Sequence, residues 1–207
     1  MLQRVAPIAL IACLVTPLAA QAPPGMKMRV DASTDASDPD NTPQVKVVTA
    51  GKGFRVTGGP ASVLWNPANT ATGNYTVRAI FHLMQPSNHT NYYGIVFGGN
   101  ALEGAAQAYT YFVVAQDGTF LVKGRSGAST PTIQAKTKHA SIKTPDASGQ
   151  SVNTLEVRVA GDTVSYVVND MVVHTTPKSA VKTDGIVGVR INHVLDVTVE
   201  SFEVKKG

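Results

Sequence analysis

Residues 109–127, YTYFVVAQDGTFLVKGRSG, predict a strand, a tight turn and a second strand. The dipeptide Asp117-Gly118 favours a two-residue hairpin turn, because both central positions of such a turn need positive φ. With this turn, Ala115 lies opposite Phe120 and Val113 lies opposite Val122. Alternation along the strands then gives a core face of Tyr109, Tyr111, Val113, Ala115, Phe120 and Val122. The other face, the one that solvent or a ligand can reach, carries Thr110, Phe112, Val114, Gln116, Thr119, Leu121, Lys123 and Arg125.

The same period of two begins at residue 45 and continues almost to the C-terminus. Short β-branched or aromatic runs alternate with turn residues, and Gly161-Asp162 and Asn169-Asp170 suit further hairpin turns. The expected strands are 45–50, 54–59, 61–67, 74–84, 92–99, 109–116, 119–126, 154–161, 163–169, 171–176, 185–192 and 194–204, with a further short strand near 131–135. Helical periodicity never lasts longer than two turns. The pattern predicts an all-β fold, an antiparallel two-sheet jelly-roll sandwich over residues 45–207.

The first 44 residues differ from the rest of the chain. Residues 1–20 hold one positive charge, Arg4, then an apolar run, then small residues, as is typical of a bacterial secretory signal peptide. The run is too short for a membrane span. An alternative is a lipoprotein anchored through Cys13, because LIAC resembles a lipobox. We expect a periplasmic or extracellular protein.

Residues 21–44 are rich in Pro, Ser, Asp and Thr and predict a flexible polar linker. Four acidic residues in this stretch leave a weak alternative, a structural calcium site, because calcium prefers clustered oxygen ligands. These residues are Asp31, Asp35, Asp38 and Asp40. Their irregular spacing lacks the glycine and the final glutamate of an EF-hand.

Composition excludes several classes of protein. Apolar residues make up 43% and charged residues 15% of the 207 residues, which indicates a globular chain. Cys13 is the only cysteine, so removal of the leader leaves neither a disulfide nor a thiolate metal site. The formal charge of +4 is scattered and too small to indicate nucleic-acid binding. We expect no cofactor and no metal.

A family resemblance covers roughly residues 45–205. The segments YYGIVFGG, YTYFVVAQDGTFLVKGRSG, NTLEVRVAGDTVSYVVNDMVV and GIVGVRINHVLDVTVESFEV, in that order, resemble the concanavalin A-like lectin/glucanase jelly rolls. Within that superfamily they are most similar to laminin-G-like domains and bacterial 3-keto-disaccharide hydrolase-like domains. The resemblance implies two antiparallel sheets, a curved face and frequent sugar binding, but it transfers no mechanism.

Three motifs of known catalytic centres do not occur in the sequence. The Glu-x-Asp-x-x-Glu strand of family 16 glucanases does not occur. Its nearest substitute, Asp196 and Glu200, lies about 13 Å apart along one strand, and glycosidase carboxylates lie at most about 9.5 Å apart. There is also no Gly-x-Ser-x-Gly elbow and no phosphate-binding loop.

Two groups of residues are candidates for ligand binding. Arg190, Asn192, His193 and Asp196 crowd the turn RINHVLD, although Asp196 and Arg190 could simply pair with each other. Arg78, Lys123 and Arg125 are the candidates on a sheet face, where cations can bind hydroxyls or a carboxylate; an ordinary solvated face is the alternative. Tyr92, which follows the polar loop 85–91, is a candidate rim contact. Trp65 is either core or a stacking platform.

These observations leave three functions open. The first, which we favour, is an exported, non-catalytic carbohydrate-binding module with a saccharide or glycan as its partner. The second is a hydrolase of sugar derivatives, which requires His193, Asp196, Arg190 or Glu103 to converge in one pocket. The third is a structural or adhesion domain.

Overall fold

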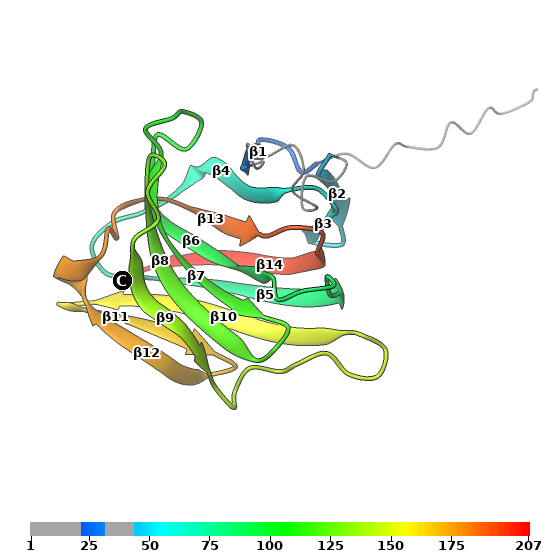
Figure 1. Cartoon of the computed structure of the whole chain (residues 1–207). Helices are drawn as coiled ribbons and strands as arrows, with labels where there is room; N and C mark the ends of the chain where they lie inside the picture. The colour runs from blue at the N-terminus through cyan, green and yellow to red at the C-terminus, as the bar shows by residue number, and fades with distance from the viewer. Residues whose placement is uncertain (1–21, 32–43) are drawn as a thin grey trace, which may run out of the picture.

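The computed structural model describes residues 22–31 and 44–207, and it shows two antiparallel sheets of seven strands each (Figure 1). Sheet A has the order β1-β4-β13-β6-β7-β8-β9, and sheet B has the order β12-β11-β10-β5-β14-β3-β2. The strands of sheet A are β1 (Lys27–Asp31), β4 (Ala61–Ala71), β13 (Gly185–Ile191), β6 (Tyr92–Asn100), β7 (Ala108–Ala115), β8 (Thr119–Ser126) and β9 (Thr132–Lys138). Those of sheet B are β12 (Met171–Pro177), β11 (Thr163–Val168), β10 (Ser151–Ala160), β5 (Tyr75–Gln85), β14 (Asp196–Lys206), β3 (Gly53–Thr57) and β2 (Lys46–Ala50).

Every strand that the sequence predicts is present, so the two-sheet jelly roll is confirmed. The assignment of residues 21–44 to a flexible linker is wrong for Lys27–Asp31, which form β1 at the edge of sheet A. This strand escapes a pattern search because its apolar residues, Met28 and Val30, are exposed, whereas Arg29 and Asp31 are half-buried. Residues 32–43 lie outside the described part of the chain.

The main core fills the space between the sheets. Inward residues alternate along each strand, as in Val77, Ala79 and Phe81 of β5, which are fully buried. Aromatic rings from both sheets meet there, with the Phe112 and Tyr166 centroids 5.2 Å apart. Each large apolar side chain buried in this way contributes roughly 1.5–3 kcal/mol.

The β7–β8 hairpin has a register that differs by one residue from the prediction. Val114, not Ala115, pairs with Phe120. The amide of Gly118 donates to the carbonyl of Ala115 at 3.1 Å, and Gly118 has φ +80. The loop is therefore a three-residue turn whose last residue is left-handed, and not a two-residue turn.

This register exchanges the partners on the two faces of the hairpin. Phe112 and Val114 face the core with Phe120 and Val122. Tyr109, Tyr111 and Val113 instead share the outer face of sheet A, which points away from sheet B, with Leu121, Lys123 and Arg125. The candidate cations therefore lie among tyrosines.

The Asn169-Asp170 turn agrees with the prediction. Val168 pairs with Met171, and the two residues between them have φ of 50 and 68. Positive φ at both positions is the geometry of a two-residue hairpin turn.

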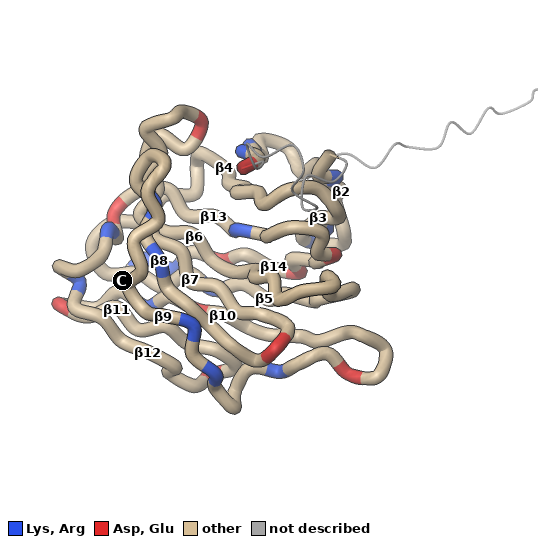
Figure 2. Tube along the Cα trace, viewed as in Figure 1, with Lys and Arg blue, Asp and Glu red and all other residues tan. Residues whose placement is uncertain are grey.

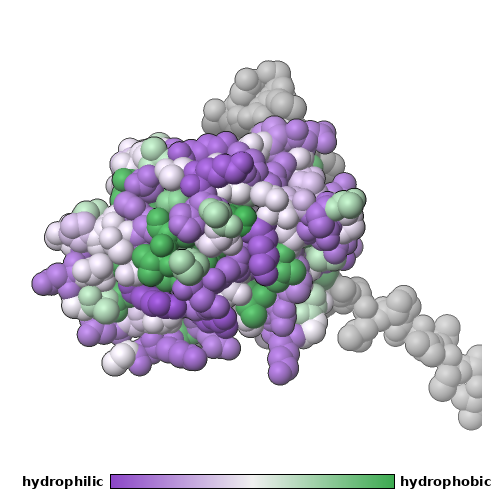
Figure 3. Space-filling model, turned by 90° about the horizontal axis from the view of Figure 1, so that it is seen from below, coloured by the Kyte–Doolittle hydropathy of each residue, from purple (hydrophilic) through white to green (hydrophobic). Residues whose placement is uncertain are grey.

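Seen from below, where β9 and β12 lie, the molecule shows an apolar area among polar residues (Figure 3). Met171 and Val172 at the start of β12 are among the exposed apolar side chains. Within residues 22–31 and 44–207, no helix is long and apolar enough to cross a membrane.

Candidate functional site

A row of paired residues crosses the outer face of sheet A through all seven strands. Its members, from β1 to β9, are Lys27, Trp65, Gly188, Val96, Tyr111, Lys123 and Thr132. A neighbouring row places Arg29 beside Val63 and Arg190. The sheet therefore gathers residues from positions 27 to 190 onto one surface.

The residues at the base of this surface are aromatic and almost fully buried. Tyr109 and Tyr111 are 1% and 7% exposed, and their ring centroids lie 5.8 Å apart. Trp65 is 3% exposed and packs in the same cluster, so it belongs to a core and offers little area for stacking. Burial raises the pKa of both tyrosines, and the Arg190 charge opposes this effect, so both hydroxyls are protonated at neutral pH.

Arg190 contacts several residues of the outer face. Its side chain, 11% exposed, donates to the Asp31 carboxylate at 2.9 Å and to the Tyr109 hydroxyl at 3.1 Å. The guanidinium carbon lies 5.3 Å from the centre of the Tyr111 ring, within the range of a cation–π contact. Arg190 therefore does not form the pair with Asp196 that the sequence left open as an alternative.

Asp31 is shared among several arginines. Arg29 donates to it at 3.0 Å, opposite the contact with Arg190. Burial raises the pKa of Asp31, but the hydrogen bonds and charges of Arg190, Arg29 and Arg125 outweigh burial and hold this pKa below its ordinary value. The carboxylate is therefore ionised at neutral pH.

The part of the outer face that a ligand can reach lies along β8. Leu121, Lys123 and Arg125, which we name the β8 strip, are half-buried and point away from the core. Arg125 donates from Nε to the carbonyl of Gly127 at 2.6 Å. Among the described residues, neither Lys123 nor Arg125 has a carboxylate partner, and Figure 2 shows basic residues along β8 and on β13.

Tyr92 lies at one end of the same face. It packs against the outer-face cluster, close to Lys136 on β9, whose pKa is raised mainly by Asp117 and also by Tyr92. Lys136 also bridges to Asp117 at 2.6 Å. Burial raises the pKa of Asp117, but Lys136 and the Thr119 hydroxyl outweigh burial and lower this pKa.

The other predicted residues lie elsewhere. Arg78 is on the outer face of sheet B, where it bonds Glu156 at 2.9 Å. Asp196 is also on sheet B and pairs with Arg55. Asn192 and His193 lie in the turn from β13 to β14, where the His193 carbonyl accepts a bond from Asn91 at 3.1 Å. The predicted crowding of Arg190, Asn192, His193 and Asp196 therefore does not form one site.

This separation bears on the hydrolase alternative. Arg190 points outward from sheet A and Asp196 outward from sheet B, and packed sheets lie about 10 Å apart. Glu103, in the loop after β6, bonds Lys27 at 2.5 Å and is well exposed. The residues that a hydrolase would need are therefore not brought together in one pocket.

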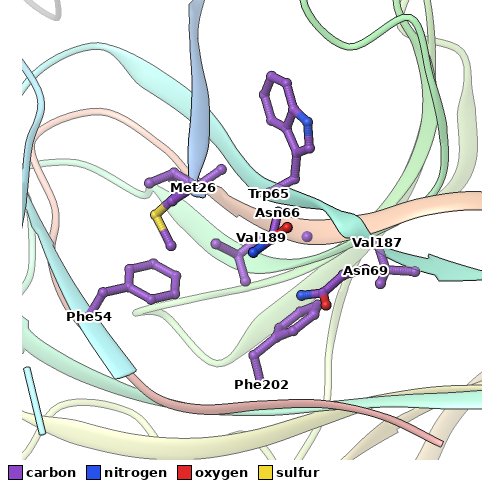
Figure 4. Close-up of a pocket in the computed structure, with 10 residues that line it drawn as sticks. Met26, Phe54, Trp65, Asn66, Asn69, Val187, Val189 and Phe202 are labelled. Carbon is purple, nitrogen blue, oxygen red and sulfur yellow. The ribbon is translucent and has the colours of Figure 1, made fainter. Parts of the chain in front are cut away.

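A cavity of about 100 Å³ lies at the end of the sandwich near β3 and β4. In Figure 4, Met26, Phe54 and Phe202 gather around it, and the Trp65 indole points away from them. Ligand pockets generally occupy about 300–1,000 Å³, so this cavity is too small for a saccharide.

A larger hollow, of about 760 Å³, lies on the outer face of sheet B. His82 and Glu200, which line it, are bonded to each other at 2.6 Å. Lys52 and Glu203 also line this hollow, so it holds charges of both signs, in contrast with the β8 strip, whose charged residues are both cations.

No group of three or more His, Cys, Asp or Glu side chains within residues 22–31 and 44–207 could hold a metal ion. Asp31 is engaged by arginines, which compete with a cation for its oxygens. Asp35, Asp38 and Asp40, the other acids of the considered calcium site, lie outside the described residues.

Sequence reasoning does not find three residues of this face as parts of a saccharide site. It places Asp31 in the linker, as a weak calcium candidate, and it places Tyr109 and Tyr111 in the core. A three-residue turn at Asp117-Gly118 would have placed the tyrosines beside Lys123 and Arg125 from the sequence alone. The partner of Arg190 carries no local signal, because 159 positions separate it from Asp31.

No protein-family model matches the chain, and no curated protein matches its sequence. Among solved structures, carbohydrate-binding module CBM66 from Bacillus subtilis is 12% identical, covering 79% of this chain and 93% of that one, with a TM-score of 0.60. A protein of unknown function with a galectin-like fold, also from Bacillus subtilis, is 11% identical over 87% of this chain and 88% of that one, with a TM-score of 0.62.

A third solved structure is an enzyme. The GH16 protein of the Bacteroides ovatus mixed-linkage glucan locus, in complex with a G4G4G3G product, is 7% identical over 90% of this chain and 97% of that one, with a TM-score of 0.56. At these identities the likeness shows the fold and no more. The closer resemblance to laminin-G-like and 3-keto-disaccharide hydrolase-like domains stays a prediction. The chain has a two-sheet jelly-roll fold that is similar to the folds of these three solved structures.

Proposed function

We propose that this chain is a non-catalytic carbohydrate-binding β-sandwich whose saccharide site is the outer face of sheet A along the β8 strip. One observation carries the proposal: Lys123 and Arg125 project from this face with no carboxylate partner among the described residues, beside a floor of tyrosines. Charged donors of this kind bind sugar hydroxyls and carboxylates. The carbohydrate-binding module among the similar structures supports the same class of function.

The proposal includes export. Residues 1–20 have the pattern of a bacterial signal peptide, so the module would act in the periplasm or outside the cell. A glycan surface or a soluble saccharide would be its partner there.

A glycan array probed with residues 21–207 tests this function. Binding by the wild type, reduced at least about tenfold in the Lys123→Ala/Arg125→Ala variant, is expected, because each lost charge-assisted bond costs about 1.5–3 kcal/mol. The variant Arg78→Ala is the control, because Arg78 lies on sheet B. No saccharide binding by the wild type would contradict the proposal and leave a structural or adhesion role.

A further inference from the structure

We infer that the saccharide bound along the β8 strip is acidic, a hexuronate polymer whose carboxylates are recognised by Arg125 and Lys123. The inference rests on the proposed function and names the chemical class of its ligand. It follows from the charges that sheet A collects on its outer face.

Positive charges outnumber negative charges around Asp31. Arg190 and Arg29 bond this carboxylate directly, at 2.9 and 3.0 Å. Arg125 lies close enough for its charge to act on Asp31, Tyr109 and Tyr111. Three arginines therefore lie around one carboxylate, only two of them bonded to it, and Lys123 adds a further cation on the same face.

The excess positive charge of the outer face lies next to residues that are poorly solvated. Arg190 is 11% exposed at its side chain, and the tyrosines around it are nearly closed to solvent. Charges are screened least where water is excluded, so the excess cation favours the approach of an anion. A neutral sugar would leave that excess uncompensated.

The geometry of the two reachable cations also favours an acidic ligand. Arg125 uses Nε on the Gly127 carbonyl, and the hydrogen bonds of the described residues leave both of its Nη groups without an acceptor. The paired Nη groups of an arginine match the two oxygens of a carboxylate. Lys123, two residues earlier on the same face, lies about 7 Å away along the strand. Two acidic groups of one chain can therefore be contacted.

Isothermal titration calorimetry with three polymers tests the inference. The probes are polygalacturonate, its fully methyl-esterified form and poly-L-glutamate. Polygalacturonate is a sugar polymer with free carboxylates, and its methyl ester is the same polymer without charge. Poly-L-glutamate carries carboxylates but no sugar. Polygalacturonate is expected to bind at least about tenfold more tightly than the other two polymers. Its affinity is expected to fall as salt is added, because the contacts are ionic.

Matched variants locate the effect. Lys123→Gln/Arg125→Gln is expected to lose at least about tenfold in affinity for polygalacturonate. Lys143→Gln/Lys205→Gln removes the same charge elsewhere and is expected to bind as the wild type does; Lys205 is on sheet B and lies 3.8 Å from Glu203. Thermal unfolding of each variant confirms that it is folded.

Each of the other outcomes of the titrations would overturn one stated part of the proposals. Equal affinity for polygalacturonate and its ester would overturn the acidic class and leave saccharide binding intact. Equal affinity for poly-L-glutamate would show charge attraction alone, which overturns both proposals. No binding of polygalacturonate would overturn the inference, and the glycan array would then decide the proposed function independently.

Discussion

Asp31 is the carboxylate on which the charges of the outer face depend. It joins β1 to β13 through Arg190 and is flanked by Arg29 on its own strand. Its side chain is 10% exposed, so this ion pair is far less screened than the exposed pairs of the surface. Removal of the carboxylate would leave Arg190 as a buried cation without a counter-charge.

We expect Asp31→Asn to lower the free energy of unfolding at pH 7 by roughly 3–5 kcal/mol, the usual cost of breaking a buried pair. The pKa of Asp31 is lowered in the folded state, so its contribution is complete above the unfolded-state pKa of about 3.9 and is lost as the pH falls through the folded value. Urea unfolding at several pH values measures this. The difference between wild type and variant should vanish at the acid end.

The exposed Asp162→Asn is the control for this experiment, and a change within about 0.5 kcal/mol is expected for it. A gap between wild type and Asp31→Asn that stays constant down to the lowest pH at which both fold would contradict the ion-pair role.

At the residue scale, the sequence predicts side-chain types better than it predicts partners. Lys123 and Arg125 are candidates on a sheet face and Tyr92 is a candidate rim contact, and the structure places all three on the outer face of sheet A. Arg190 was also a candidate, but its partner proved to be Asp31. Pairing across 159 positions depends on which strands become neighbours, and no local pattern encodes that.

At the scale of elements, the β7–β8 hairpin shows that a strand can be predicted with the correct bounds while its residues are assigned to the wrong face of the sheet. The predicted bounds 119–126 match β8, yet the register is off by one residue. Because side chains alternate with a period of two, one residue of slip exchanges the faces of one strand relative to its neighbour. The error came from the loop, because Asp-Gly is compatible with both two- and three-residue turns.

Gly118 carries the conformation that fixes this register. Its φ is +80, a region that costs a residue with a side chain roughly 1–2 kcal/mol, and an added Cβ would lie 3.2 Å from Thr144. We expect Gly118→Ala to lower the free energy of unfolding by about that amount, as measured by chemical denaturation.

Gly104→Ala is the matched control for the loop substitution. Gly104 has no positive φ in the restrictive range, and a Cβ there would meet nothing closer than 3.9 Å. An effect of Gly118→Ala no larger than that of Gly104→Ala would contradict the three-residue turn.

At the scale of the whole molecule, the architecture was predictable from the sequence, whereas the neighbours of Lys123 and Arg125 on the outer face were not. Thirteen of the fourteen strands follow from alternation and turn residues, because those signals are local. The outer-face row takes residues from seven strands, and its order follows from the crossovers of the jelly roll. The exception among the strands, β1, has exposed apolar and half-buried charged residues, the reverse of the usual pattern.

Truncation tests the place of β1 in the sandwich. A chain that starts at residue 45 lacks β1. It therefore lacks Asp31, and also Lys27, whose partner in the sheet register is Trp65. We expect a melting temperature several degrees below that of a chain starting at residue 22, since about 1 kcal/mol shifts the melting temperature by roughly 2–8 °C. Trp65, the one tryptophan, should then show a red-shifted emission.

Asp31→Asn in the longer chain separates the two effects of this truncation, because it removes the carboxylate and keeps the strand. An unchanged melting temperature and emission in the shorter chain would mean that β1 contributes nothing to the folded sandwich.

The central claim is that saccharide binds to the outer face of sheet A and not to sheet B. Backbone amide chemical shifts, followed by NMR while the glycan that binds most strongly on the array is added, test it most directly. We predict that the largest shifts fall on β8 and on Tyr92, with Arg125 and Gly127 among them. Shifts confined to the sheet B hollow around His82 and Glu200 would contradict the account.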